Sequence, residues 1–228
     1  MKASNVRLLA VLAALLCLVT AFQEGPWVAL LKGNDVTAWR GFRQKEFPAK
    51  GWDVADGVLH HAKGGGGGDL VTRETYGDFE LRFQWKVSPG ANSGVMYRVS
   101  EEFAAPYESG PEYQVLDDAR HADGKNPKTS AAALYALIAC NASKATKPVG
   151  EWNKGRIVVR ANHVEHWLNG ARVVEYDFNG PALASLVAES KFKAWPGFAK
   201  QAAGHICLQD HGDEVWYRNI RIRRITAN

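Results

Sequence analysis

The chain has 228 residues, a formal net charge of +4 and 23% charged residues. This balance argues against a strongly basic nucleic-acid-binding protein, and no run of Lys or Arg forms a patch along the sequence. Eight Trp, seven Tyr and nine Phe are many for this length. Aromatic side chains fill β-sandwich cores and also stack against sugar rings, and composition does not separate the two uses.

The first residues have the three parts of a secretory signal. Lys2 and Arg7 precede an apolar run at 8–19, which ends in small residues. The run is shorter than the ~20 residues that span a bilayer, and the Leu before Cys17 does not suit a lipoprotein signal. We therefore expect residues 1–21 to be removed, no membrane span, and an exported mature protein in the periplasm or outside the cell. Loss of the two cations lowers the net charge from +4 to +2.

The mature part, residues 22–228, contains Cys140 and Cys207 and no other cysteine. In an oxidising compartment they could pair, and a buried free thiol on a strand is about as consistent with the sequence. No CxxC and no Cys/His spacing is present, so a structural zinc site is not expected.

Period-2 alternation recurs along the mature chain. It is clearest at 79–87, where apolar and polar residues alternate without a break. Asp56-Gly57 and Asn169-Gly170 each separate two such runs, which predicts tight hairpins. Helical periodicity is confined to one or two turns within 183–193. Many short strands at regular spacing predict one all-β domain over 22–228, a two-sheet antiparallel jelly-roll sandwich.

Several connections are longer than simple turns. The segments 100–111, 117–130 and 179–203 have the length of loops that form the rim of a functional site. The five glycines at 64–68 lack the Gly-Lys-Ser/Thr ending and the following helix of a phosphate-binding loop. They predict a flexible loop, or a rim segment whose backbone lies close to a ligand.

Alternation also places unusual polar residues opposite the apolar faces. If Val95, Tyr97 and Val99 face the core, Asn92 and Arg98 face outward. The same argument sends outward the residues Glu112, Gln114, Gln209 and His211, with Tyr113, Val115, Ile206 and Leu208 buried. If these strands share one sheet, the polar set forms a hydrogen-bonding groove that suits a carbohydrate. The alternative is an ordinary solvated face, which more often carries Lys, Glu and Thr.

Other candidates are less specific. Tyr135 is equally consistent with a core residue and with a residue whose hydroxyl lies at the site. His166 is consistent with a histidine that has its hydrogen-bond partners inside a sheet. Asp117 and Asp118 suggest a cation ligand pair, but adjacent strand residues point apart.

The order of short motifs resembles a known family. The motifs are Leu31-Lys32-Gly33-Asn34-Asp35, Tyr76-Gly77-Asp78-Phe79-Glu80-Leu81, Asn92-Ser93-Gly94, Glu112-Tyr113-Gln114-Val115-Leu116-Asp117, Trp167-Leu168-Asn169-Gly170, Gln209-Asp210-His211-Gly212 and Val215-Trp216-Tyr217-Arg218-Asn219-Ile220-Arg221-Ile222. Together they resemble the 3-keto-disaccharide hydrolase domain, from about Trp27 to Ile225. The resemblance implies a concanavalin A-like lectin/glucanase fold and cleavage of 3-keto-glycosides that a partner sugar 3-oxidoreductase makes.

A ketone at C3 acidifies the C2 hydrogen, so the glycosidic bond can break by elimination and water can then add to the enone. Such a reaction needs a base, an acid and a stabiliser of the enolate oxygen. We expect Glu112 and His211 to be the acid and the base in either order, and Arg98 to stabilise the enolate. Asn92, Gln114, Gln209 and Tyr135 are expected to bind the sugar. A divalent metal could replace Arg98, although no clear ligand set is visible.

Two other functions stay open on this fold. One is a non-catalytic, lectin-like carbohydrate-binding module, and the other is an ordinary glycoside hydrolase. The strand motif Glu-x-Asp-x-x-Glu of laminarinase-type retaining enzymes is absent, since Gln114 stands where that motif has Asp. This disfavours a retaining mechanism with two carboxylates.

Overall fold

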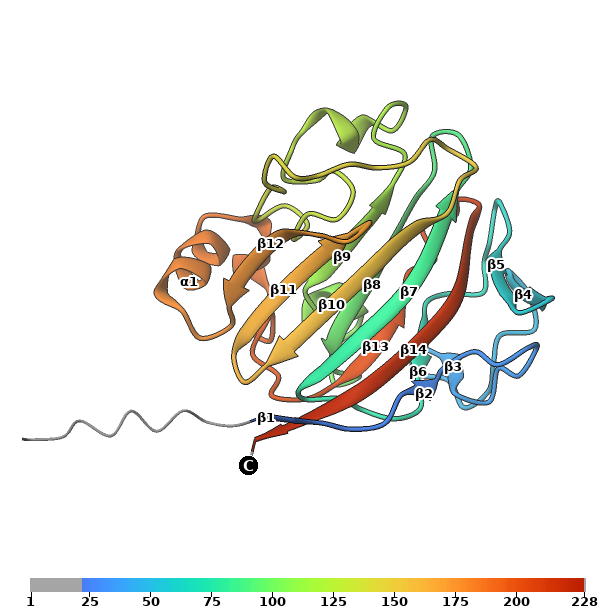
Figure 1. The fold of residues 1–228 in the computed structure, drawn as a ribbon, viewed down its shortest axis with the longest axis horizontal. Coiled ribbons are helices and arrows are strands. Elements are labelled where there is room, and N and C mark those ends of the chain that lie inside the picture. Colours follow the sequence, from blue (N-terminus) through green and yellow to red (C-terminus); the bar gives the residue numbers. More distant parts are fainter. Residues whose placement is uncertain (1–21, 228) are drawn as a thin grey trace, which may run out of the picture.

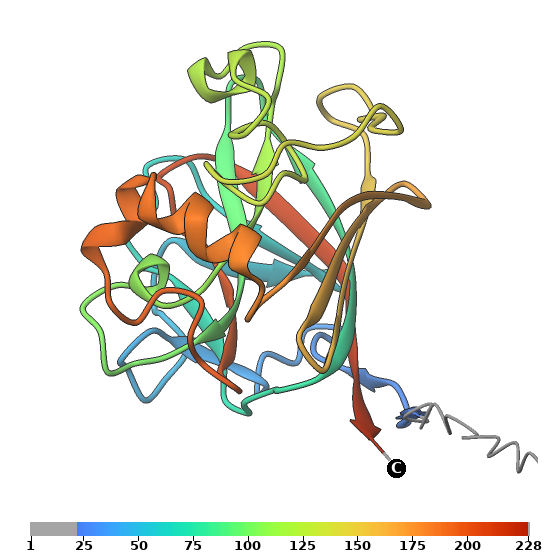
Figure 2. The same ribbon diagram turned by 90° about the vertical axis from the view of Figure 1, so that its left-hand side faces the viewer.

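The computed structural model describes residues 22–227, so the predicted signal segment lies outside the described residues. Two antiparallel sheets pack face to face, with the larger sheet in front in Figure 1 and the two layers seen from the side in Figure 2. The predicted all-β, two-sheet sandwich is confirmed.

The larger sheet has nine strands in the described part of the chain. Their order is β12-β11-β10-β7-β14-β5-β4, and β1 and β2 pair with the long strand β14. The strands are β1 (Phe22–Glu24), β2 (Val28–Ala29), β4 (Trp52–Ala55), β5 (Val58–His61), β7 (Phe79–Val87), β10 (Asn153–Arg160), β11 (His163–Leu168), β12 (Ala171–Asp177) and β14 (Val215–Ala227).

Within residues 22–227 the smaller sheet has five strands in the order β3-β6-β13-β8-β9. They are β3 (Trp39–Gly41), β6 (Leu70–Thr72), β8 (Asn92–Val99), β9 (Glu112–Leu116) and β13 (His205–Leu208). Strand β8 lies between β13 and β9, so segments far apart in the sequence become neighbours.

The predicted alternation and hairpins are present. Phe79, Leu81, Phe83, Trp85 and Val87 of β7 all lie in the core between the sheets. The β4–β5 hairpin turns at Asp56-Gly57, and the β11–β12 hairpin turns at Asn169-Gly170 with φ of 51° and 96°. Positive φ at both central residues matches the right-handed twist of the flanking strands.

Helical structure is short. The helix α1 (Pro181–Ala188) and the turn η3 (Lys191–Ala194) overlap the segment 183–193, which was expected to hold one or two turns. The turns η1 (Pro106–Glu108) and η2 (Ala122–Lys125) lie in other connections. Figure 2 shows the α1 segment, in orange, on the side of the smaller sheet. Between residues 22 and 227 no helix has the length and apolarity to cross a membrane.

Both cysteines of the mature part are free thiols. Cys207 is fully buried on the outer side of the smaller sheet with Met96 and Val71, whereas Cys140 packs against the core from a loop. Burial raises the pKa of the Cys140 thiol to about 11, and burial also raises the pKa of the Cys207 thiol. The pairing that the sequence left open is therefore absent from the described structure.

Candidate functional site

A cavity of about 450 Å³ lies on the outer face of the smaller sheet. Six of the seven residues proposed from the sequence line it, namely Asn92, Glu112, Gln114, Tyr135, Gln209 and His211. The other lining residues are Asp69, Tyr107, Gly110, Lys191, Phe192, Trp195 and Asp210. The polar groove inferred from alternation thus exists as one cavity.

Strand order explains why these residues meet. Glu112 and Gln114 project from the outer face of β9, and Asn92 begins the adjacent strand β8. Gln209, Asp210 and His211 follow β13 on the other side of β8, where the amide of Gln209 donates to the carbonyl of Gly94. The alternate residues Tyr97, Tyr113, Val115, Ile206 and Leu208 are all buried in the core, as predicted.

Arg98 does not lie in this cavity, so its expected position is wrong. Between the pairs His205–Val99 and Cys207–Met96, β8 contains one residue more than β13, and Arg98 has a φ of 53°. This β-bulge interrupts the alternation. The Arg98 guanidinium instead donates to Asp78 Oδ1 at 3.2 Å and to two backbone carbonyls. Val99, expected in the core, joins Met96 and Cys207 in the outer cluster.

Glu112 is a buried carboxyl that faces the cavity. Its residue surface is 8% exposed, and within residues 22–227 its side chain makes no ion pair or hydrogen bond. The carboxyl lies over Gly94, where any Cβ would collide with it. Burial raises the pKa of Glu112 to about 8; the Lys191 cation opposes this rise, and the Asp69 and Asp123 carboxylates add to it. Glu112 is therefore protonated at neutral pH.

Asp69 is a second carboxyl in the cavity, and sequence reasoning missed it. It precedes β6, and its Oδ1 accepts a hydrogen bond from the Asp210 amide at 2.8 Å. Burial raises its pKa to about 6, and the nearby Asp210 carboxylate contributes in the same direction. A carboxylate directly after five glycines was the available signal, because such a run lets the backbone come close to a site.

The glycine run holds Asp210. The amides of Gly66 and Gly68 donate to Asp210 Oδ2 at 3.2 and 2.9 Å, and the amide of Gly212 donates to Oδ1 at 2.9 Å. Buried His61 contacts the same oxygen through Nε2 at 2.9 Å. Burial by itself would raise the pKa of Asp210, but these amides and His61 lower it overall. The run is thus a rim segment that fixes one wall of the cavity.

His211 stands at the mouth, with its side chain 47% exposed. Its Nε2 lies 3.4 Å from Asn92 Nδ2, and its Nδ1 lies 3.8 Å from Asp213 Oδ2. The backbone amide of Asn92 donates to that same Asp213 oxygen at 3.0 Å. The imidazole thus stands between the Asp213 carboxylate on one side and the Asn92 side-chain amide on the other.

The expected sugar-binding residues differ in whether their polar side-chain atoms are available to a ligand. Asn92 Oδ1 is buried and has no hydrogen-bond partner within residues 22–227, so it is an acceptor available to a ligand. Gln114 is less free, because its Nε2 donates to the Thr129 carbonyl at 3.2 Å and its Oε1 accepts from the Val115 amide at 3.1 Å. Gln209 lines the cavity beside them.

Tyr135 and Lys191 form the opposite wall. The Lys191 ammonium lies 4.4 Å from the centre of the Tyr135 ring. The Tyr135 hydroxyl donates to Asp123 Oδ2 at 3.4 Å, and burial first, then the Asp123 charge, raises its pKa to about 12. Lys191 is thus the cation that lines this cavity, in the role expected of Arg98. Beyond a short helical pattern, no signal in the sequence pointed to it.

Two of the three predicted rim segments line the cavity. Tyr107 of η1 meets Trp195, the residue after η3, with ring centroids 5.2 Å apart. The segment 117–130 contributes indirectly, since His121 lies edge-on to His211.

In residues 22–227 no group of three or more His, Cys, Asp or Glu is arranged to hold a metal ion. His166 is the buried sheet histidine that the sequence suggested, and both of its ring nitrogens are hydrogen-bonded.

The fold is a two-sheet jelly-roll sandwich, and one polar cavity on it gathers carboxyl, imidazole and aromatic side chains. A Bacillus subtilis protein with a galectin-like fold superposes with a TM-score of 0.56 over 91% of this chain and 100% of its own, at 12% identity, which shows the fold alone.

Nearer relatives give the family. Residues 26–223 match the 3-keto-alpha-glucoside-1,2-lyase-like domain. A 3-keto-disaccharide hydrolase from Bacteroides thetaiotaomicron is 36% identical over 227 residues, which cover 86% of this chain and 78% of the relative. A crystal structure from Parabacteroides distasonis ATCC 8503, whose description proposes a glycosyl hydrolase, has a TM-score of 0.79 and 32% identity over 87% of this chain and 93% of its own. The chain belongs to the 3-keto-alpha-glucoside-1,2-lyase-like family, and these relatives support a function of the glycoside hydrolase type.

Proposed function

We propose that this protein cleaves the glycosidic bond of 3-keto-glycosides or 3-keto-disaccharides by elimination followed by hydration. The observation that carries the proposal is a buried, protonated carboxyl, Glu112, that shares an open cavity with the imidazole of His211. An acid and a base in separate environments are what elimination across C1 and C2 requires. The relative named 3-keto-disaccharide hydrolase supports the substrate class.

The proposed roles use Glu112 as the acid and His211 as the base. His211 Nε2 removes the C2 hydrogen as a proton, and the Lys191 ammonium stabilises the enolate oxygen at C3 in place of Arg98. The C1–O bond then breaks as Glu112 gives its proton to the leaving oxygen. In hydration, ionised Glu112 takes a proton from water, the hydroxide bonds to C1, and protonated His211 returns its proton to C2. The net change is addition of one water across the glycosidic bond.

Asp69 tunes Glu112 in this scheme. Two carboxyls that share a low-dielectric cavity do not both ionise readily, so Asp69 helps to keep Glu112 protonated. Because Glu112 must carry its proton, kcat should fall as pH rises through about 8.

The substrate class is tested with pairs of glycosides that are identical except for oxidation at C3. We expect turnover of the 3-keto member alone. Turnover of both members would identify an ordinary glycoside hydrolase, and binding without turnover of either would identify a lectin-like module.

The elimination mechanism is tested in D₂O with Glu112→Gln and His211→Asn. Glu112→Gln should still exchange the C2 hydrogen for deuterium while releasing the aglycone at least ~100-fold more slowly. A 3-keto glucoside with 4-nitrophenol as leaving group should restore much of that loss, because this group needs little protonation. His211→Asn should lose the exchange itself.

Glu102→Gln is the matched control, since Glu102 is an exposed carboxylate away from the cavity. Full aglycone release by Glu112→Gln from a poor leaving group would remove Glu112 from the mechanism. Release without any C2 exchange in the unmodified protein would contradict elimination.

Two physiological statements belong to the same proposal. The substrate's ketone must be made by a sugar 3-oxidoreductase, so the protein acts after such an enzyme. Removal of residues 1–21 and export to the periplasm or the exterior are proposed from the sequence, and the mass and N-terminus of protein recovered from these fractions test them.

A further inference from the structure

The outer face of the larger sheet gathers cations, although no cationic run exists in the sequence. Strands β7, β10 and β14 are adjacent, and each presents basic residues at alternate positions on this face. These residues are Arg82, Lys86, Lys154, Arg156, Arg160, Arg218, Arg221 and Arg223. Strand pairing therefore builds a basic patch that no cationic run in the sequence indicates.

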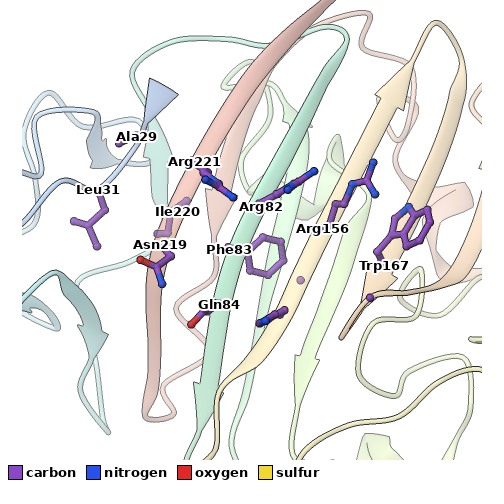
Figure 3. A pocket seen from close by; sticks show the side chains of 13 residues that line it. Ala29, Leu31, Arg82, Phe83, Gln84, Arg156, Trp167, Asn219, Ile220 and Arg221 are labelled. Carbon is purple, nitrogen blue, oxygen red and sulfur yellow. The ribbon is translucent and has the colours of Figure 1, made fainter. Parts of the chain in front are cut away.

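A second cavity, of about 670 Å³, lies in this face. Figure 3 shows Arg221, Arg82 and Arg156 side by side across the three strands, with Trp167 of β11 at the flank. Lys154, Gln84 and Asn219 also line it. It lies on the opposite sheet from Glu112 and His211, so it is separate from the proposed catalytic cavity.

The guanidinium groups at this cavity are held in place but not neutralised. The buried carboxylate of Glu80, 1% exposed, contacts Arg82 at 2.7 Å and Arg156 at 2.6 Å, and also pairs with Arg223. Within residues 22–227, Lys154 and Arg221 have no carboxylate within ion-pair distance. Arg82, Lys154, Arg156 and Arg221 thus line the cavity, and one shared carboxylate, that of Glu80, lies beneath them. The cavity therefore carries a surplus of positive charge.

Aromatic rings restrict the same cations. The Arg156 guanidinium lies 4.7 Å from the centre of the Trp167 ring, and Trp167 Nε1 donates to Glu165 Oε2 at 2.8 Å. Arg82 and Arg221 each lie 4.9 Å from the centre of the Trp27 ring. Planar guanidinium forks that are already ordered lose little entropy when they bind a carboxylate through two parallel hydrogen bonds.

We propose that this cavity binds an acidic oligosaccharide, with uronate carboxylates on Arg82, Arg156 and Arg221 and the sugar in contact with Trp167. The charge surplus selects an anion, and the planar forks suit carboxylates. The indole of Trp167 and, across the cavity, the amides of Gln84 and Asn219 suit a sugar. A bound acidic glycan would hold the protein while the other sheet stays open to substrate.

Isothermal titration of the full mature chain with trigalacturonate tests the proposal, with maltotriose as the neutral probe and a short single-stranded oligodeoxynucleotide as the other polyanion. We expect saturable binding of trigalacturonate that weakens with salt, and no comparable binding of the other two. The double variant Lys154→Gln/Arg221→Gln should bind it at least ~10-fold more weakly. Neither residue pairs with Glu80, so folding should be unaffected, as circular dichroism will verify.

The double variant Lys45→Gln/Lys200→Gln removes the same charge from exposed positions elsewhere and should bind like the parent. Equal weakening in both double variants, binding of the oligonucleotide with equal affinity, equal binding of maltotriose, or no saturable binding would each overturn the proposal. Glu112→Gln should keep full affinity, because binding here does not depend on the proposed reaction.

Discussion

At the scale of single residues, the site depends on keeping one carboxyl neutral. Glu112 has no basic partner in direct contact among the described residues, and Gly94 beneath it leaves the space that its carboxyl occupies. Such burial is costly for an ionised group, so the group keeps its proton instead. Glu112 is thus a proton donor at neutral pH, and its burial lowers the stability of the fold.

That cost gives a prediction for Glu112→Gln. The pKa is raised from 4.5 in the unfolded chain to about 8 in the fold, so the native state holds more protons between these values. The free energy of unfolding of the parent should therefore fall as pH rises from about 5 to about 8, and the variant should lack this part of the decline. Urea unfolding at both pH values measures it. A stability difference between variant and parent that is the same at both pH values would contradict the raised pKa; Glu102→Gln is the control.

Gly94 gives a second prediction at this scale. In Gly94→Ala the added Cβ collides with the Glu112 carboxyl, so we expect that side chain to move and aglycone release to fall at least ~10-fold. The shorter side chain in Gly94→Ala/Glu112→Asp should recover thermal stability relative to Gly94→Ala. Normal kinetics in Gly94→Ala would show that Glu112 has room elsewhere.

At the scale of elements, hydrogen bonds inside the core join the two sheets. Tyr97 of β8 bonds to His166 of β11 and to the Tyr176 hydroxyl of β12, both at 2.7 Å. His166 Nδ1 donates to the Ala132 carbonyl at 3.1 Å, so its Nε2 accepts from Tyr97. Each polar group in this buried chain has a partner, which ties β8 to the edge of the larger sheet.

We predict that His166→Phe lowers the free energy of unfolding by about 1–3 kcal/mol, because the Ala132 carbonyl and the Tyr97 hydroxyl lose their partner. Burial also lowers the pKa of His166 to about 4. The parent should therefore lose stability as pH falls from about 6.5 through about 4, where the unfolded chain takes up the proton first, and the variant should lose less. Chemical unfolding across this range measures both effects. His163→Phe, at a half-exposed position of the same strand, removes only a solvent-exposed contact with Asp177 and should cost much less.

At the scale of the whole molecule, the sandwich has two unlike outer faces. The smaller sheet carries the cavity with Glu112 and His211, and the larger sheet carries the cationic cavity. The core between them is formed by alternate residues of the same strands. One fold thus separates two polar surfaces with an apolar layer.

The stability of this fold does not rest on a disulfide. We predict that a reducing agent leaves Tm unchanged, and that both thiols of the native protein react slowly with a thiol reagent, because burial limits access and raises their pKa. Unfolding in denaturant should make both react at once. A Tm that falls on reduction, or an absence of titratable thiols after unfolding, would contradict this.

The sequence by itself determined the strands, the tight hairpins and the faces on which most site residues lie, because alternation with a period of two is a local property of the chain. It correctly placed Glu112 and Gln114 outward and Tyr113 inward. Only the tertiary structure decided what depends on strand neighbours and on local breaks of register. The bulge at Arg98 removed that residue from the cavity, and a loop and a short helical turn brought Asp69 and Lys191 into it. Pairing of β7, β10 and β14 assembled the cationic face from residues that are 65 to 139 positions apart, as for Arg82, Arg156 and Arg221, since hydrogen bonding between strands does not depend on their distance in the sequence.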